Sequence, residues 1–127
     1  MYVSVSQRPP FLVSEPSARL RVQGVSPSES PLALTFRIEA ASNAIPANAA
    51  MQRVELFNFR TNTYETADER APTGADSVVE VTFDSDAGRF VEPGTRQMRA
   101  RIGIFDRGVL LANWGIKVDH AAWAITP

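Results

Sequence analysis

The residues with the clearest chemical potential are two aspartates in a short acidic turn. Asp84-Ser85-Asp86-Ala87-Gly88 has the D-x-D-x-G opening of a calcium loop, in which carboxylates supply oxygen ligands. The sequence lacks the downstream glutamate that completes such a loop. Aspartate and glycine are also ordinary turn residues. We therefore expect a plain hairpin turn, with Asp84 and Asp86 as a weak calcium candidate and no other metal site.

The chain has a single histidine, His120, and it directly follows Asp119. Such a pair suggests acid–base chemistry, but neighbouring residues on a strand point to opposite faces and do not form a local dyad. One histidine without cysteines cannot build a typical zinc site. We expect His120 to be solvated or hydrogen-bonded.

Other catalytic arrangements are missing from the sequence. There is no G-x-S-x-G nucleophile elbow of a serine hydrolase. A glycosidase needs two carboxylates about 5–9 Å apart. Glu39, Glu55 and Glu80 lie mid-strand at outward positions, where arginine is their simplest partner. The sequence therefore predicts a protein that is not an enzyme, with no catalytic residues and no cofactor.

Arginines recur at outward positions of the expected strands. They are Arg19, Arg21, Arg37, Arg99 and Arg101. Stacked across a sheet, they would form a basic stripe with Glu39 and Glu80 interleaved. One interpretation is a cross-strand charge ladder; the other is a face that binds an anion or an acidic glycan. We favour the ladder, because the acids needed for pairing are present.

Aromatic side chains offer a second candidate surface, because flat rings stack on sugar rings. In the alternation of each strand, Trp114 falls on the side that faces the core, whereas Phe57, Phe59 and Phe105 fall on the opposite side from the core residues of their strands. These phenylalanines are either exposed as an interaction patch or covered by residues 40–50, and we favour covering. The candidate binding residues are Phe57, Phe59, Tyr64, Phe105, Arg99 and Arg101.

Two long strands near the C-terminus would position many of these side chains. Apolar and polar residues alternate within 95–105 and again within 114–119, which is the period of a half-buried strand. The expected inward residues are Met98, Ala100, Ile102 and Ile104 in the first strand, and Trp114, Ile116 and Val118 in the second. We expect a turn to join the two strands, and residues 121–125 to close the chain.

Further strands are expected upstream, separated by turn residues. Their expected ranges are 2–6, 19–23, 32–39, 52–59 and 77–83, with a short strand piece at 89–91. The first is an edge strand, because Pro9-Pro10 interrupts it. In the third, Leu32, Leu34, Phe36 and Ile38 should face the core. Residues 40–50 are expected to form a long loop, 60–63 a hairpin turn and 68–76 a polar loop.

This pattern predicts an all-β fold. Seven to nine short strands without a ten-residue helix favour an antiparallel β-sandwich, immunoglobulin/fibronectin-like or jelly-roll-like. A small closed barrel is the alternative. The length of 127 residues predicts one domain over residues 1–127.

Composition narrows the possible partners. With a net charge of −1, the chain as a whole does not attract nucleic acid electrostatically. The absence of cysteine excludes disulfides and metal sites built from thiolates. No apolar run reaches the roughly 18 residues of a membrane span. The first residues have neither a basic region nor a long apolar region, so the sequence predicts no signal peptide.

Four segments together resemble a known kind of module. They are Leu20–Pro31, Arg53–Phe59 with Tyr64-Glu65, Arg89–Arg101 and Trp114–Trp123. They are similar to a β-sandwich module found near the C-termini of large secreted or cell-surface bacterial proteins, and the match covers nearly the whole chain from about Val3. Two features depart from the module: the acidic Asp84-Ser85-Asp86 turn, and His120 beside Asp119.

The resemblance implies an exported, non-catalytic accessory module, secreted or at the cell surface, excised from a larger protein. One hypothesis is that the module binds a partner protein, a surface or a glycan through an aromatic face with a polar rim. The other is that it is structural and self-assembling, acting through strand edges or an apolar patch. That second hypothesis predicts a homo-oligomer with symmetric burial of Phe57, Phe59 or Phe105 between chains.

Overall fold

A computed structural model describes residues 2–5, 18–42, 50–71, 75, 77–106 and 114–127. These residues form strands and one short 3₁₀-helix. The elements are β1 (Tyr2–Val5), β2 (Ala18–Val25), β3 (Ala33–Ser42), β4 (Ala50–Asn58), β5 (Thr63–Arg70), β6 (Ser77–Phe83), η3 (Ala87–Phe90), β7 (Gln97–Asp106) and β8 (Trp114–Thr126). In this part of the chain, no helix is long and apolar enough to cross a membrane.

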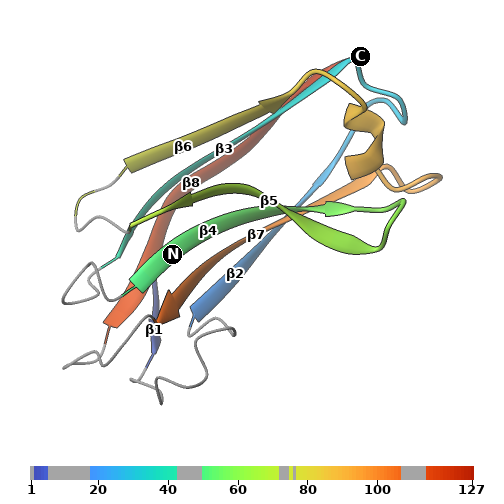
Figure 1. Cartoon of the computed structure of the whole chain (residues 1–127). Coiled ribbons are helices and arrows are strands. Elements are labelled where there is room, and N and C mark those ends of the chain that lie inside the picture. The colour runs from blue at the N-terminus through green and yellow to red at the C-terminus, as the bar shows by residue number, and fades with distance from the viewer. Residues whose placement is uncertain (1, 6–17, 43–49, 72–74, 76, 107–113) are drawn as a thin grey trace.

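The strands form two four-stranded antiparallel sheets, ordered β1-β8-β3-β6 and β2-β7-β4-β5. Figure 1 shows β6, β3 and β8 in one layer and β5, β4, β7 and β2 in the other. Strands pair in a nested series, β1 with β8, β2 with β7, β3 with β6 and β4 with β5. This is the jelly-roll arrangement of two Greek keys. The predicted antiparallel sandwich is confirmed, in its jelly-roll form.

The core lies between the two sheets and follows the predicted period of two. On β3, Leu34, Phe36 and Ile38 are buried, and on β4 so are Val54 and Leu56. On β7 the buried set is Met98, Ala100, Ile102 and Ile104, as predicted. Because inward residues alternate with outward ones, every strand of this core also presents side chains on an outer face.

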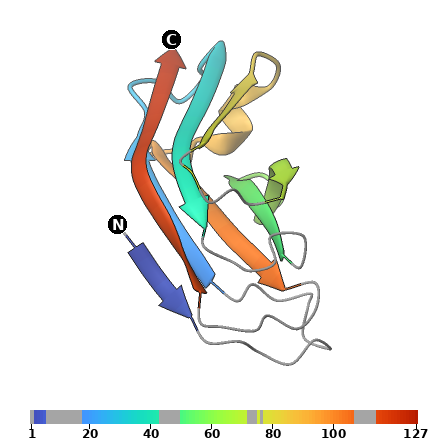
Figure 2. The same cartoon turned by 90° about the vertical axis from the view of Figure 1, so that its left-hand side faces the viewer.

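The edge strands also follow expectation. β1 pairs only with β8, and Figure 2 shows it at the border of its sheet.

The residues between β4 and β5 form the predicted hairpin turn, with Asn62 at a positive φ of 56°. Asparagine tolerates this left-handed conformation better than most residues.

Several boundaries differ from the sequence prediction. Leu32 is 70% exposed and precedes β3, so it does not belong to the core. Residues 40–42 extend β3, and residues 68–70 belong to β5. The rest of the expected 40–50 loop lies largely outside the described residues. The strands β7 and β8, predicted as neighbours joined by a turn, lie in different sheets.

The predicted strand piece at 89–91 is not a strand: Arg89 and Phe90 belong to the 3₁₀-helix η3, and Val91 follows it in an extended conformation. A 3₁₀-helix has three residues per turn, so Ala87 and Phe90 lie on the same side of it. Both are buried, and Phe90 packs on Phe83 with ring centroids 4.7 Å apart. A search for alternation cannot detect this three-residue spacing.

An irregularity in β8 changes which of its residues face inward. Glu39 pairs with His120, but the next residue, Ala40, pairs with Val118. The extra residue is a β-bulge, which shifts the inward parity along the strand. Beyond it, Ala121, Trp123 and Ile125 pack against the core. His120 is exposed, as expected for a solvated histidine; the side chains of Trp114 and Ile116 lie outside the described residues.

Gly24 provides a test of how closely the two sheets pack. A Cβ added to Gly24 would come within 2.8 Å of two ring atoms of Trp123. We expect Gly24→Ala to lower the free energy of unfolding by about 1–3 kcal/mol through overpacking, measured by urea denaturation. The matched control is Gly88→Ala, whose Cβ would come no closer than 3.4 Å to its nearest neighbour. Equal stability of the Gly24 and Gly88 variants would contradict this packing.

Candidate functional site

The predicted binding residues lie on the outer face of the β2-β7-β4-β5 sheet. Leu56 and Ala100 are register partners that face the core, so the residues beside them face outward. Phe57 is the register partner of Tyr64. We call this surface the arginine–aromatic face, made up of Arg19 and Arg21 of β2, Arg99 and Arg101 of β7, Phe57 and the adjoining Phe59, and Tyr64 of β5.

The aromatic rings of this face are in contact. The Phe57 centroid lies 4.9 Å from that of Phe59 and 5.0 Å from that of Tyr64, both edge-to-face. The Arg99 guanidinium lies 5.6 Å from the Phe57 centroid and 5.3 Å from the Phe59 centroid, and that of Arg101 lies 3.7 Å from Tyr64. These are cation–π distances. The surface is therefore a layer of guanidinium groups on half-buried rings rather than a bare aromatic platform.

A buried carboxylate fixes Arg101. Its Nε and Nη2 donate to the two oxygens of Glu55 at 2.8 and 3.2 Å, and Glu55 is only 6% exposed. Such a bidentate pair sets the orientation as well as the position of a guanidinium. The sequence suggested an arginine partner for Glu55 but did not identify which one, because strand neighbours cannot be read from parity.

The single basic stripe predicted from the sequence is divided between two outer faces. Arg37 and Glu80 are register partners on β3 and β6, in the other sheet, at 3.9 Å. Glu39 also lies in that sheet and so is not interleaved with Arg99 and Arg101. The charge ladder that we favoured describes the Arg37–Glu80 pair, whose side chains are about half exposed, and also the cross-strand Arg101–Glu55 pair.

The arginines of β2 have a different environment. Arg21 is the register partner of Arg101, and Arg19 that of Gly103. Among the described side chains, neither has a carboxylate within ion-pairing distance. Burial, together with the neighbouring charge of Arg101, lowers the pKa of Arg19. The β2 edge of the face therefore carries two arginines that have no direct ion pair among the described side chains, although the Glu55 charge acts on Arg19 from a distance.

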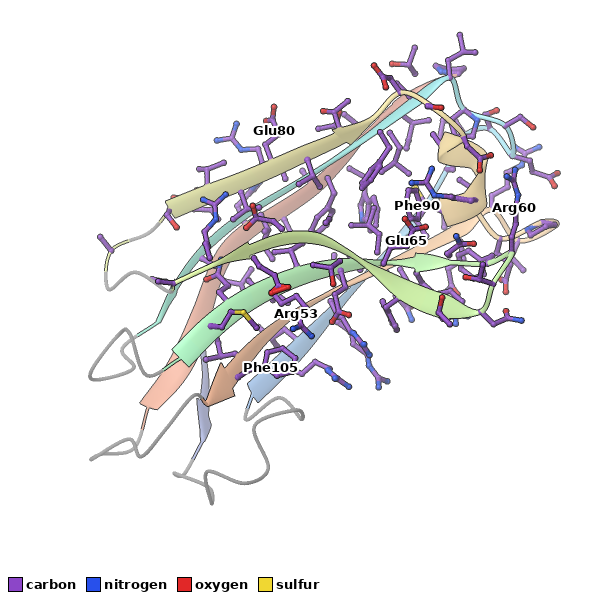
Figure 3. All side chains as sticks on the ribbon, viewed as in Figure 1. Arg53, Arg60, Glu65, Glu80, Phe90 and Phe105 are labelled. Atoms are coloured by element: carbon purple, nitrogen blue, oxygen red, sulfur yellow. The ribbon has the colours of Figure 1, made fainter. Side chains whose placement is uncertain are left out.

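Phe105 does not take part in an exposed aromatic patch. It is only 4% exposed, and the Arg53 guanidinium lies 4.5 Å from its ring centroid (Figure 3). Covering of Phe105 by residues 40–50 stays a prediction, because most of that segment is outside the described residues. Phe57 and Phe59, for which the same covering was expected, are only half-buried. Phe105 is removed from the candidate contact residues, and a self-assembly surface would have to use Phe57 and Phe59 without it.

The hairpin turn predicted at 84–88 is wrong, because Ala87 and Gly88 begin η3 and the next strand, β7, lies in the other sheet from β6. The acidic turn lies away from the arginine–aromatic face, at the end of the molecule that carries η3. Its two aspartates line a pocket of about 300 Å³ with Arg60 and Leu32. Asp86 is ion-paired with Arg60, and Arg89 donates to the backbone oxygens of Ser85 and Asp86 at 2.9 and 2.8 Å. In the described part of the chain, no three acidic or histidine side chains gather as a metal site would need. Guanidinium groups thus hold several of the oxygens that calcium would use.

A polar cluster beneath this turn joins β4, β5 and η3 (Figure 3). Glu65 accepts hydrogen bonds from Arg89 Nε and Asn58 Nδ2, both at 2.8 Å. The Arg89 guanidinium also lies 4.2 Å from the Phe90 ring centroid. The hydrogen bond from Arg89 is the main cause that lowers the pKa of Glu65 below its usual 4.5. Nothing in the sequence marks this cluster, since Arg89 is 24 residues from Glu65 and lies in another element.

The lowered pKa of Glu65 predicts loss of stability in acid. A carboxyl that is more acidic in the folded state stabilises the fold at any pH above its unfolded pKa of 4.5. That contribution is lost as the pH falls through the lower, folded pKa. We expect Glu65→Gln to lower Tm at pH 7, and the difference from the parent chain to shrink below about pH 4.5. Glu80→Gln is the control, with little change in Tm. A Tm difference for Glu65→Gln that stays constant from pH 7 to pH 3 would contradict the interpretation.

Comparison with known proteins identifies the fold only. No protein family and no curated protein matches the sequence. A solved structure described as "CBM4 structure and function" is 16% identical in sequence and superposes with a TM-score of 0.56. The match covers 98% of this chain and 82% of the chain of that structure. The similarity shows that this chain shares the β-sandwich fold of that structure.

Two other solved structures are more distant. The "EclA C-terminal domain; sugar-binding protein" is 10% identical with a TM-score of 0.44, covering 98% of this chain and 77% of its own. A xylanase 10C mutant from Cellvibrio japonicus in complex with xylopentaose is 16% identical with a TM-score of 0.47, covering 83% of this chain but 20% of its own. At these scores neither structure adds to the description of this chain.

Proposed function

We propose that this chain is a non-catalytic glycan-binding module that binds its ligand on the arginine–aromatic face. One observation carries the proposal: aromatic rings and arginines from β4, β5 and β7 meet on one outer face with ring and guanidinium contacts of 3.7–5.6 Å. The fold shared with a structure described as CBM4, a carbohydrate-binding module, supports the same assignment.

The chemistry of the face suits a sugar chain. Each guanidinium offers several N–H donors to hydroxyl and ring oxygens, while the edges of Phe57 and Tyr64 offer apolar contact to C–H groups. The Arg101–Glu55 pair and the strand backbone hold these groups in place before the ligand arrives. Preorganisation of this kind reduces the entropy that binding costs. We place the module outside the cell, as an accessory unit of a larger protein.

Native affinity electrophoresis of the intact chain tests the proposal. Gels containing single polysaccharides, neutral and acidic, are compared with a gel without polysaccharide. We expect at least one polysaccharide to retard the chain and to remain uncleaved afterwards. The control variant is Arg37→Gln, which changes only the opposite outer face and should be retarded equally. Unchanged mobility in every gel would contradict the proposal.

Size exclusion at two concentrations tests the alternative function. Self-assembly through Phe57 and Phe59 predicts an apparent mass that rises with protein concentration. A binding module with an accessible face predicts a monomer at both concentrations.

A further inference from the structure

We propose that the ligand of the arginine–aromatic face is an anionic glycan, whose acidic groups are bound along the line formed by Arg21 and Arg101. This inference rests on the proposed function and specifies its ligand class.

The arginine–aromatic face and the side chains bordering it carry more positive charge than their carboxylates can balance. Three arginines have an acidic partner: Arg101 with Glu55 at 2.8 Å, Arg53 with Glu69 at 3.5 Å, and Arg99 with Glu92 at 4.0 Å. Arg19 and Arg21 have none among the described side chains. The excess of two positive charges is local, since the chain as a whole has a net charge of −1.

The opposite outer face provides an internal comparison. There Arg37 lies across from Glu80, and the hydroxyls of Thr35 and Thr82 are 2.9 Å apart. Each polar residue of these two pairs therefore has a complementary partner across the strands. Among the described side chains, Arg37 of the opposite outer face is thus paired with a carboxylate, whereas Arg19 and Arg21 are not.

Register places two arginines side by side without an intervening acid. Arg21 and Arg101 are directly paired across β2 and β7, and like charges in this position destabilise a sheet. Natural sequences accept such local costs mainly at functional sites. Glu55, the register partner of Arg101 on its other side, offsets part of this repulsion, and an anionic ligand at Arg21 would remove the remainder.

The donor chemistry selects the type of anion. Two nitrogens of Arg101 are committed to Glu55, and Arg99 Nε donates to Gln97 at 2.8 Å. Arg21 is exposed and makes no hydrogen bond to a described side chain, so its planar donor fork can take a carboxylate or a sulfate with two parallel bonds. The rings beside these arginines contact sugar rings, which distinguishes a glycan from a small anion.

Isothermal titration calorimetry on the intact chain tests this inference with matched sugars. The probes are an oligogalacturonate, a neutral galacto-oligosaccharide of equal length, a sulfated heparin oligosaccharide and single-stranded oligo-dT. We expect the oligogalacturonate to bind at least tenfold tighter than the neutral sugar, and its affinity to fall as salt rises. Arg21→Gln should weaken binding of the acidic sugar about tenfold and weaken binding of the neutral sugar much less, because only the acidic sugar loses an ion pair. Arg37→Gln should change neither, and equal Tm values confirm that both variants fold.

The outcomes separate this inference from the proposed function. Comparable binding of the heparin oligosaccharide, with the same loss in Arg21→Gln, supports anionic recognition by sulfate as well as carboxylate; binding of galacturonate alone supports carboxylate recognition. Equal affinity for neutral and acidic sugars, with no effect of Arg21→Gln, overturns the inference while glycan binding stands. Equal binding of oligo-dT overturns it in favour of a general polyanion surface. Failure of every sugar to bind overturns both proposals.

Discussion

Replacing Tyr64 with alanine is expected to weaken glycan binding about 10- to 100-fold, or about 1.4–2.8 kcal/mol. Tyr64 lies on the β5 side of the proposed surface, with its ring centroid 5.0 Å from that of Phe57 and 3.7 Å from the Arg101 guanidinium. Its removal takes away apolar contact area and one of the surfaces that hold Arg101 in place. Tyr64 belongs to the edge strand β5 and is only partly buried, so the fold should survive its loss.

The control for this prediction is Tyr64→Phe. It keeps the ring and its contact with Arg101, so its affinity should stay within about threefold of the parent chain. Both variants are measured by calorimetry against the best ligand from the electrophoresis panel. If Tyr64→Ala binds with the affinity of the parent chain, the aromatic part of the face is not part of the binding surface.

The largest effect on stability is expected from Glu55→Ala. Removing one partner of a buried ion pair costs about 3–5 kcal/mol, because the remaining charge loses its compensation. We expect the lower end of this range, about 3 kcal/mol, because the Arg101 side chain retains 19% exposure. The nearby Arg21 adds repulsion that Glu55 otherwise offsets.

Two further variants separate the ion pair from simple loss of packing. Glu80→Ala removes a carboxylate from a half-exposed pair and should change the free energy of unfolding by less than about 1 kcal/mol. The double variant Glu55→Met with Arg101→Leu replaces both charges by apolar groups and should recover most of the lost stability. Urea denaturation measures all of these variants. Equal effects of Glu55→Ala and Glu80→Ala would show that Glu55 is not held as described.

The sequence was informative wherever a period of two applied. Alternation correctly assigned the inward residues of β7 and most of those of β3, and it placed Arg99, Arg101 and Phe57 outward. It failed where the backbone follows a different period. The 3₁₀-helix brings Ala87 and Phe90 to one side, and the bulge in β8 reverses parity at a point that no residue type marks.

The candidate site was only partly predictable for a related reason. Parity tells which side of its own strand a residue occupies, but not which strands are neighbours. The aromatic and arginine sets were therefore identified separately, and Glu39 and Glu80 were assigned to a stripe from which the sheet order excludes them. The burial of Phe105 depends on neighbouring segments, so its parity alone could not reveal it.

The central claim is that the outer face of the β2-β7-β4-β5 sheet is the ligand surface. Two-dimensional ¹H–¹⁵N NMR, including the arginine Nε–Hε signals, tests it during titration with an oligogalacturonate. The account predicts shifts at Arg21, Arg99, Arg101 and the Tyr64 amide, with no change at Arg37. Shifts confined to the pocket around Asp84 and Asp86, or to the outer face of β3 and β6, would contradict it.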